Sequence, residues 1–181
     1  MRIILDTNVI LAAFTAHGLS QAIFEYCLEE HDLFLNEDIL AEFAAVLRRK
    51  FKMPSDLIET SVSFLRTAGT LEKPVPVDPA SCRDPSDLHI LGLAARTRAD
   101  VIISGDHDLL DIRSFQTIPI LSPRQFWERE HPPRPGFIRI GLVMAKTGRT
   151  KRRMDQPDYF FISVLRRNFR GSGPRGFGHS P

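Results

Sequence analysis

Short runs of Ile, Val and Leu alternate with longer helical segments along most of this chain. Each apolar run has the composition of a strand that is covered on both faces; the runs are RIIL at 2–5, DLFL at 32–35, DVIIS at 100–104 and TIPIL at 117–121. The segments between them have helical spacing or helix start signals, and they are 9–14, 19–30, 37–50, 55–68, 85–98, 107–112 and 124–130. This alternation predicts an α/β fold with a mostly parallel central sheet.

The charge distribution divides the chain in two. Residues 1–130 hold 13 Lys/Arg and 20 Asp/Glu, a net of −7, whereas residues 131–181 hold 11 and 2, a net of +9. The boundary coincides with the linker-like sequence HPPRPG, and the chain ends in GSGPRGFGHSP. We therefore predict one domain over 1–130, followed by a basic extension over 131–181 that is expected to be disordered.

The composition indicates the cellular compartment in which the protein is expected. No apolar run approaches the ~20 residues of a membrane helix, and Asp6 interrupts the N-terminal apolar run too early for a signal peptide. The two cysteines, Cys27 and Cys82, are too few for a disulfide framework or a zinc site. We expect a cytoplasmic protein without a membrane partner and with reduced thiols.

Acidic residues follow two of the predicted strands. Asp6 comes directly after RIIL, and Asp106 follows DVIIS and Gly105, with Asp108 two residues on. In open α/β sheets ligands bind at the carboxyl ends of the strands, so these acids converge if their strands are neighbours. Alternatively, each acid caps the helix that follows it.

Asp87 falls within the helix predicted over 85–98. At 100° per residue it lies about 60° from Ile90, inside the apolar stripe. A buried carboxylate needs a partner, which favours a functional site. The alternative is a capping box in which Asp84 is the N-cap and Asp87 reaches back to a backbone N–H.

Glu42 lies at the border between the apolar and polar faces of helix 37–50, where a glutamate is usually a solvated charge. Several carboxylates in one place repel each other unless a cation holds them. Oxygen ligands without His or Cys select Mg²⁺ or Mn²⁺. The sequence contains no HExxH, GxSxG or GxxxxGK[ST] motif, which argues against a zincin, a hydrolase triad and a P-loop NTPase.

The motifs LDTNV, RDPSD and SGDHDLL, together with the acidic helix near residue 40, resemble those of PIN-domain nucleases, and most closely the PIN toxins of bacterial toxin–antitoxin pairs. The resemblance covers about residues 1–130. It implies a three-layer α/β/α fold and a Mg²⁺- or Mn²⁺-dependent endoribonuclease. It also implies a homodimer and a cognate antitoxin partner.

The resemblance also assigns roles to residues of this chain. It places the catalytic acids at Asp6, Glu42, Asp87 and Asp106. The implied metal ligands are Asp6, Asp87, Asp106 and, as a further candidate, Asp108. Thr7, Asn8 and Ser104 match positions that support the site. The basic extension has no counterpart in such toxins, and its cations are expected to contact RNA phosphates without sequence preference; the candidates are Arg149, Lys151, Arg152 and Arg153.

Two other protein classes that have an Asp after the first strand fit this sequence less well. Haloacid-dehalogenase-like enzymes need a second Asp two residues after the first, where this chain has Asn8. Receiver domains need a phosphoacceptor Asp and a Lys after later strands, and the chain offers no such Lys near 85–106. A PIN domain that binds RNA or a partner without cutting remains the alternative function.

Overall fold

The structure is a computed structural model that describes residues 1–16 and 18–132. The basic extension beyond Pro132, with Arg149, Lys151, Arg152 and Arg153, lies outside the described residues. Six strands form one sheet in the order β3-β2-β1-β4-β6-β5. The strands are β1 Arg2–Leu5, β2 Asp32–Leu35, β3 Thr70–Leu71, β4 Val101–Ile103, β5 Ser114–Phe115 and β6 Ile118–Leu121. All neighbours pair in parallel except β5 and β6.

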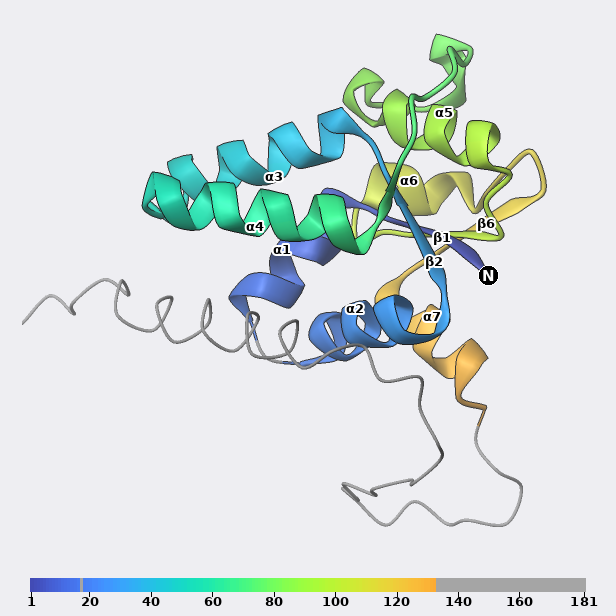
Figure 1. The fold of residues 1–181 in the computed structure, drawn as a ribbon. Coiled ribbons are helices and arrows are strands. Elements are labelled where there is room, and N and C mark those ends of the chain that lie inside the picture. The colour runs from blue at the N-terminus through green and yellow to red at the C-terminus, as the bar shows by residue number, and fades with distance from the viewer. Residues whose placement is uncertain (17, 133–181) are drawn as a thin grey trace, which may run out of the picture.

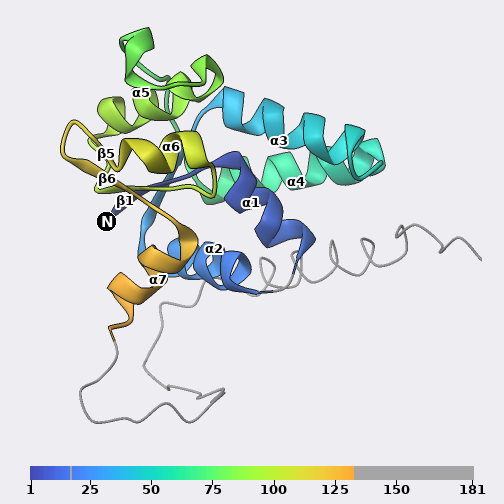
Figure 2. The same ribbon diagram turned by 180° about the vertical axis from the view of Figure 1, so that it is seen from behind.

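Helices cover both faces of this sheet. They are α1 Thr7–Thr15, α2 Leu19–Glu30, α3 Glu37–Arg49, α4 Ser55–Ala68, α5 Leu88–Thr97, α6 His107–Ile112 and α7 Pro123–Glu130, with the 3₁₀ turns η1 Pro79–Ser81 and η2 Pro85–Asp87. Figures 1 and 2 place α5 and α6 over one face and α2 and α7 over the other, while α3 and α4 project as a helical hairpin. The predicted α/β/α architecture is confirmed. None of the helices in the described part of the chain is both long and apolar enough to cross a membrane.

The core explains why the apolar runs form central strands. Ile3, Ile4 and Leu5 of β1 are fully buried, because the strand has neighbours on both edges and helices on both faces. Next to the sheet, Phe14 of α1 packs edge to face against Phe24 of α2 and Phe43 of α3, with ring centroids 5.5 and 5.1 Å apart. These contacts attach the helices that flank the end of β1 to the core.

A close backbone crossing fixes α5 against the extended segment 72–77. The Val75 N–H donates to the Gly92 carbonyl at 3.2 Å. A Cβ at Gly92 would lie 2.2 Å from the Val75 carbonyl oxygen, so no larger residue fits there without a backbone shift. The crossing requires glycine in the middle of α5, despite its low helix propensity.

Two details differ from the sequence predictions. The helix expected over 85–98 is two elements, because Pro85 begins a 3₁₀ turn and α5 starts only at Leu88. Placing Asp87 on the apolar stripe of an α-helix was therefore wrong. The antiparallel hairpin partner β5 was not predicted, because two residues are too few to show a strand pattern.

Candidate active site

Three adjacent parallel strands end at the same edge of the sheet. In the sheet order, β1 lies between β2 and β4, and Ile4 is in register with both Phe34 and Ile102. The residues that follow these strands are Asn36, Asp6 and Ser104, and all three are buried. Strand register thus brings polar side chains from distant parts of the sequence to one place, as expected for the carboxyl edge of a parallel sheet.

Asp6 is held by two side-chain donors. Its Oδ2 accepts a hydrogen bond from the Ser104 hydroxyl at 2.5 Å and another from the Asn8 amide at 2.7 Å. Asp6 is only 5% exposed. Burial raises the pKa of Asp6 to about 6, opposed by the Ser104 hydrogen bond and reinforced by the charges of Glu42 and Asp106. Its side chain makes no capping bond to α1, so the capping alternative does not explain Asp6.

The predicted supporting residues also order the loop after β4. The Asn8 Oδ1 accepts the Gly105 N–H at 3.1 Å, and the Ser104 Oγ accepts the Asp106 N–H at 2.9 Å. Asn8 and Ser104 therefore each join Asp6 to the loop that carries Asp106. Asp106 does cap its helix, because its Oδ1 accepts the Asp108 N–H at 2.8 Å. The capping interpretation is correct for that one oxygen.

Glu42 reaches the same region from α3. The hydroxyl of Thr7, which is 1% exposed, donates to the Glu42 Oε2 at 2.6 Å. Glu42 itself is exposed, yet this bond directs its carboxylate toward the end of β1. The Thr7–Glu42 bond links α1 to α3 across 35 positions of the sequence.

Asp87 lies half-buried near the other acids. Burial raises the pKa of Asp87 to about 7, and the charges of Asp6, Asp106, Asp84 and Glu42 add to the effect. The Cys82 thiol lies 3.9 Å from the Asp87 Oδ2. Asp84 caps η2 through the Ser86 N–H, as predicted, but the Asp87 side chain neither completes a capping box with Asp84 nor caps α5. The capping-box alternative for Asp87 is therefore wrong.

Of the four acids named from the sequence, Glu42 and Asp106 thus contribute to the raised pKa values of both Asp6 and Asp87. That the four acids carry catalysis stays a prediction. Asp108 stands apart, because its half-buried carboxylate has Oδ1 3.7 Å from the exposed Arg83 guanidinium. A ligand role for Asp108 would have to compete with that ion pair.

One polar residue of this edge was missed from the sequence. Asn36, 1% exposed, follows β2 as Asp6 follows β1. Its Oδ1 accepts the Ile39 N–H at 2.8 Å and so caps α3, while its Nδ2 lies 3.1 Å from the Nδ1 of His89. Burial lowers the pKa of His89, consistent with a neutral ring that accepts this bond. The signal was present, since Asn36 directly follows the apolar run DLFL.

The donor set suits a hard cation but does not form a closed cage. Among residues 1–16 and 18–132, no three His, Cys, Asp or Glu side chains are grouped closely enough to hold a metal ion by themselves. Mg²⁺ usually keeps several waters and binds through one or two carboxylates together with substrate phosphates. The oxygen-only set of Asp6, Asp87 and Asp106 fits an ion held in that open manner.

Comparisons with known proteins identify the family. The family model described as a PIN domain matches residues 2–108. A similar solved structure is that of VapBC2 from Rickettsia felis bound to a DNA fragment from its promoter; it has 11% sequence identity and a TM-score of 0.48, and the match covers 67% of this chain and 98% of that one. No curated protein matches the chain. The match over residues 2–108 shows that this chain belongs to the PIN-domain family.

Proposed function

We propose that the chain is a Mg²⁺- or Mn²⁺-dependent endoribonuclease that acts as the toxin of a toxin–antitoxin pair. PIN domains are generally nucleases, which supports hydrolase activity on nucleic acids. The observation that carries the proposal is the convergence of four carboxylates at the end of β1, where burial, reinforced by the charges of the neighbouring acids, raises the pKa of Asp6 to about 6 and that of Asp87 to about 7. A fold that keeps acids under such repulsion favours a bound cation.

The side chains of this edge have separable tasks. Asp6, Asp87 and Asp106 would hold the ion, with Asp108 as a further candidate. Ser104 and Asn8 orient Asp6, and Thr7 orients Glu42. When bound, such an ion makes water a nucleophile at neutral pH and stabilises the charge of a leaving oxygen. Glu42, which is exposed and held by one hydrogen bond from Thr7, would accept a proton from the attacking water.

The direct test is cleavage of end-labelled RNA with Mn²⁺ and with EDTA. The parent protein should cut only with the divalent ion and leave 5′-phosphate and 3′-hydroxyl ends, because water attacks and the 3′ oxygen departs. Cyclic 2′,3′-phosphate ends, or cutting that survives EDTA, would contradict the mechanism. A parallel single-stranded DNA substrate checks the preference for RNA.

Asp87→Asn and Asp84→Asn form a matched pair for this assay. Both acids lie in the same turn, but only Asp87 has its pKa raised by the other site acids. Asp87→Asn should lower activity by orders of magnitude with the fold intact, whereas Asp84→Asn should keep most of it. RNA binding by the parent without cutting would instead support the non-catalytic alternative.

The toxin role, the antitoxin and the homodimer are part of the proposal and rest on the sequence resemblance. Expression of the parent in bacteria should slow growth, and Asp87→Asn should relieve this effect. If both proteins slow growth equally, toxicity does not come from the proposed chemistry. Light scattering of the purified chain tests the homodimer.

A further inference from the structure

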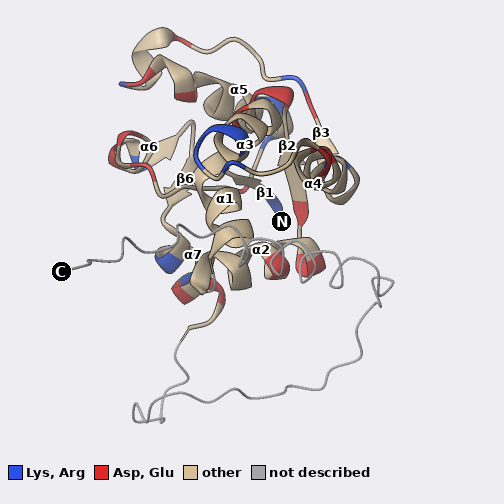
Figure 3. Ribbon diagram, turned by 90° about the vertical axis from the view of Figure 1, so that its left-hand side faces the viewer, with Lys and Arg blue, Asp and Glu red and all other residues tan. Residues whose placement is uncertain are grey.

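The C-terminal end of α3 carries a cluster of cations. The cluster, here called the basic end of α3, consists of Arg48, Arg49, Lys50 and Lys52, and all four are exposed. Figure 3 shows the blue of Lys and Arg gathered at this end of α3. Within the described residues, none of the four forms an ion pair with an acid. The Lys50 ammonium lies 5.9 Å from the centroid of the Phe51 ring, whereas the charges of Arg48, Arg49 and Lys52 are available to a ligand.

One member of the cluster shares a helix face with Glu42. Arg49 follows Glu42 by seven residues, which places it about 20° around the helix and about 10 Å further along its axis. Arg48, by contrast, lies about 120° around the helix from Glu42. Two adjacent arginines of equal charge and similar exposure thus differ in whether they lie on the side of the candidate site.

The surface between Glu42 and Arg49 is uncharged. Ala45 and Val46 occupy the intervening turn of α3, and the neighbouring helix α1, Thr7–Thr15, contains no charged residue. A polyanion that leaves the acidic site along this line meets no further acid from α1 or from this stretch of α3 before it reaches Arg49. Because the site acids repel phosphates, affinity for RNA in the absence of metal depends on cations outside the acidic edge.

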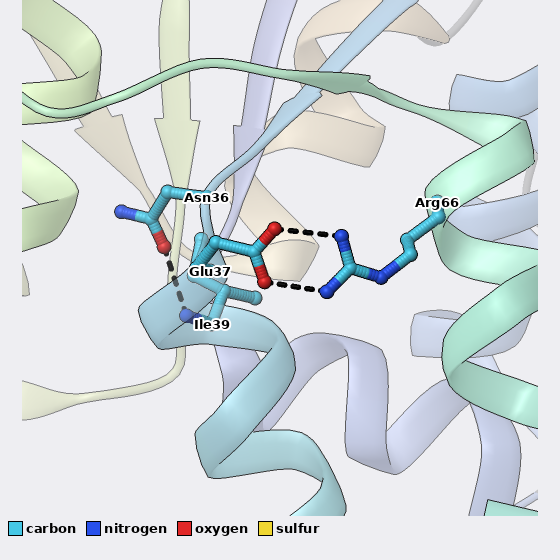
Figure 4. Close-up of polar contacts among 4 residues, drawn as sticks. All are labelled: Asn36, Glu37, Ile39 and Arg66. Atoms are coloured by element: carbon cyan, nitrogen blue, oxygen red, sulfur yellow. Dashed lines mark hydrogen bonds and ion pairs between the residues drawn. The ribbon is translucent and has the colours of Figure 1, made fainter. Parts of the chain in front are cut away.

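The orientation of α3 is fixed at its other end. Asn36 caps the first turn through the Ile39 N–H, and Glu37 forms two hydrogen bonds of 2.6 and 2.5 Å with Arg66 of α4 (Figure 4). The Thr7–Glu42 bond is a second attachment, which joins α3 to α1. These two attachments hold α3, and with it Arg49, in a fixed direction relative to the end of β1.

We propose that Arg49 binds a backbone phosphate of single-stranded RNA whose scissile bond lies at the acidic site, and so positions the strand along α3. This inference rests on the proposed nuclease function. The simpler explanation of the basic end is that cations in a last turn favour the helix dipole. That explanation applies to Arg48 and Arg49 alike, so the two variants separate it from phosphate binding.

The experiment compares Arg49→Gln with Arg48→Gln in the full chain. Binding of a short fluorescein-labelled oligouridylate is measured by anisotropy in EDTA, where no cleavage occurs, across salt from about 50 to 200 mM. Arg49→Gln should weaken binding and reduce the slope of log affinity against log salt by about 0.7, the value for one phosphate contact on a single strand. Arg48→Gln should change the slope little. The basic extension contributes equally to both proteins.

Cleavage in Mn²⁺ provides the second readout. Arg49→Gln should raise KM more than it lowers kcat, and Arg49→Lys should retain the parent's salt slope because it keeps the charge. Equal effects of Arg48→Gln and Arg49→Gln, or no effect of either, would overturn the proposal. If the parent binds RNA with this asymmetry but never cuts it, the nuclease function fails while the phosphate contact stands.

Discussion

The hydroxyl of Ser104 donates a 2.5 Å hydrogen bond to the Oδ2 of Asp6, joining residues 98 positions apart at the ends of two adjacent strands. The same hydroxyl oxygen accepts the Asp106 N–H. One small side chain therefore holds one site acid and the loop that carries another.

Ser104→Ala should reduce the rate of RNA cleavage and shift the acidic limb of the pH–rate profile to higher pH. The Ser104 bond lowers the pKa of Asp6, so without it Asp6 stays protonated to a higher pH. The measurement is a pH–rate profile of the variant and the parent. Ser63→Ala, at an exposed position of α4, is the control. An unchanged profile would show that Asp6 does not titrate in the reaction.

Thr7→Val should reduce the rate of RNA cleavage clearly while lowering the free energy of unfolding only slightly. Valine keeps the shape of the buried side chain but removes the donor to Glu42, and loss of one such bond costs about 1 kcal/mol. Thr15→Val, which removes a hydroxyl bond to Leu11 within the same helix, is the matched control. Steady-state kinetics and urea unfolding separate the two effects. Equal activity of the two variants would contradict a positioning role for Thr7.

The raised pKa of Asp87 predicts that, without metal, the free energy of unfolding has an unusual dependence on pH. The folded pKa of Asp87, about 7, is above its unfolded value of 3.8. The folded state therefore binds more protons than the unfolded state between these values, and stability falls as pH rises through this interval. Asp87→Asn in EDTA should become progressively more stable than the parent over the same interval.

Asp84→Asn should have the opposite effect on the free energy of unfolding. Bonds from Ser86 lower the pKa of Asp84, so its ionised form stabilises the fold, and the variant should be less stable than the parent at neutral pH. Urea unfolding of the three proteins across this pH range tests both expectations. A parent that gains stability relative to Asp87→Asn as pH rises would show that the acids are not in conflict.

Truncation after Pro132 should leave a folded PIN domain that binds RNA less tightly at low salt. The cut keeps His131, whose ring stacks on Trp127 with centroids 3.9 Å apart. The removed segment includes Arg149, Lys151, Arg152 and Arg153, and its contribution to phosphate binding should fade as salt rises. Circular dichroism and salt-dependent anisotropy are the measurements. A truncated chain that does not fold would place the boundary elsewhere.

The sequence predicts the layers of this fold well because buried strands and amphipathic helices have distinct periods. RIIL and DVIIS are central strands, and Asp6 lies at the end of the first as expected. Short elements were missed, since the 3₁₀ turn at Pro85–Asp87 and the strand Ser114–Phe115 are too brief for a periodic pattern.

Side-chain partners that depend on tertiary structure could not be predicted from spacing. The Thr7–Glu42 and Asn36–His89 contacts join separate elements, and nothing local in the sequence encodes them. For Glu42 the local pattern favoured a solvated charge, and only the family resemblance assigned it to the site. The gathering of acids at the carboxyl edge of the sheet could be predicted, because acids that follow neighbouring parallel strands converge there.

Titration calorimetry of Mn²⁺ into the protein saturated with a non-cleavable oligoribonucleotide, whose phosphates complete the open site, tests the central claim most directly. At pH 7, where Asp87 is partly protonated, binding at the acidic edge must displace protons. Two buffers with different protonation enthalpies reveal that release. We predict Mn²⁺ binding with proton release in the parent and in Asp84→Asn, and loss of both in Asp87→Asn. No binding by the parent, or binding that Asp87→Asn leaves unchanged, would contradict a metal-dependent nuclease built on these acids.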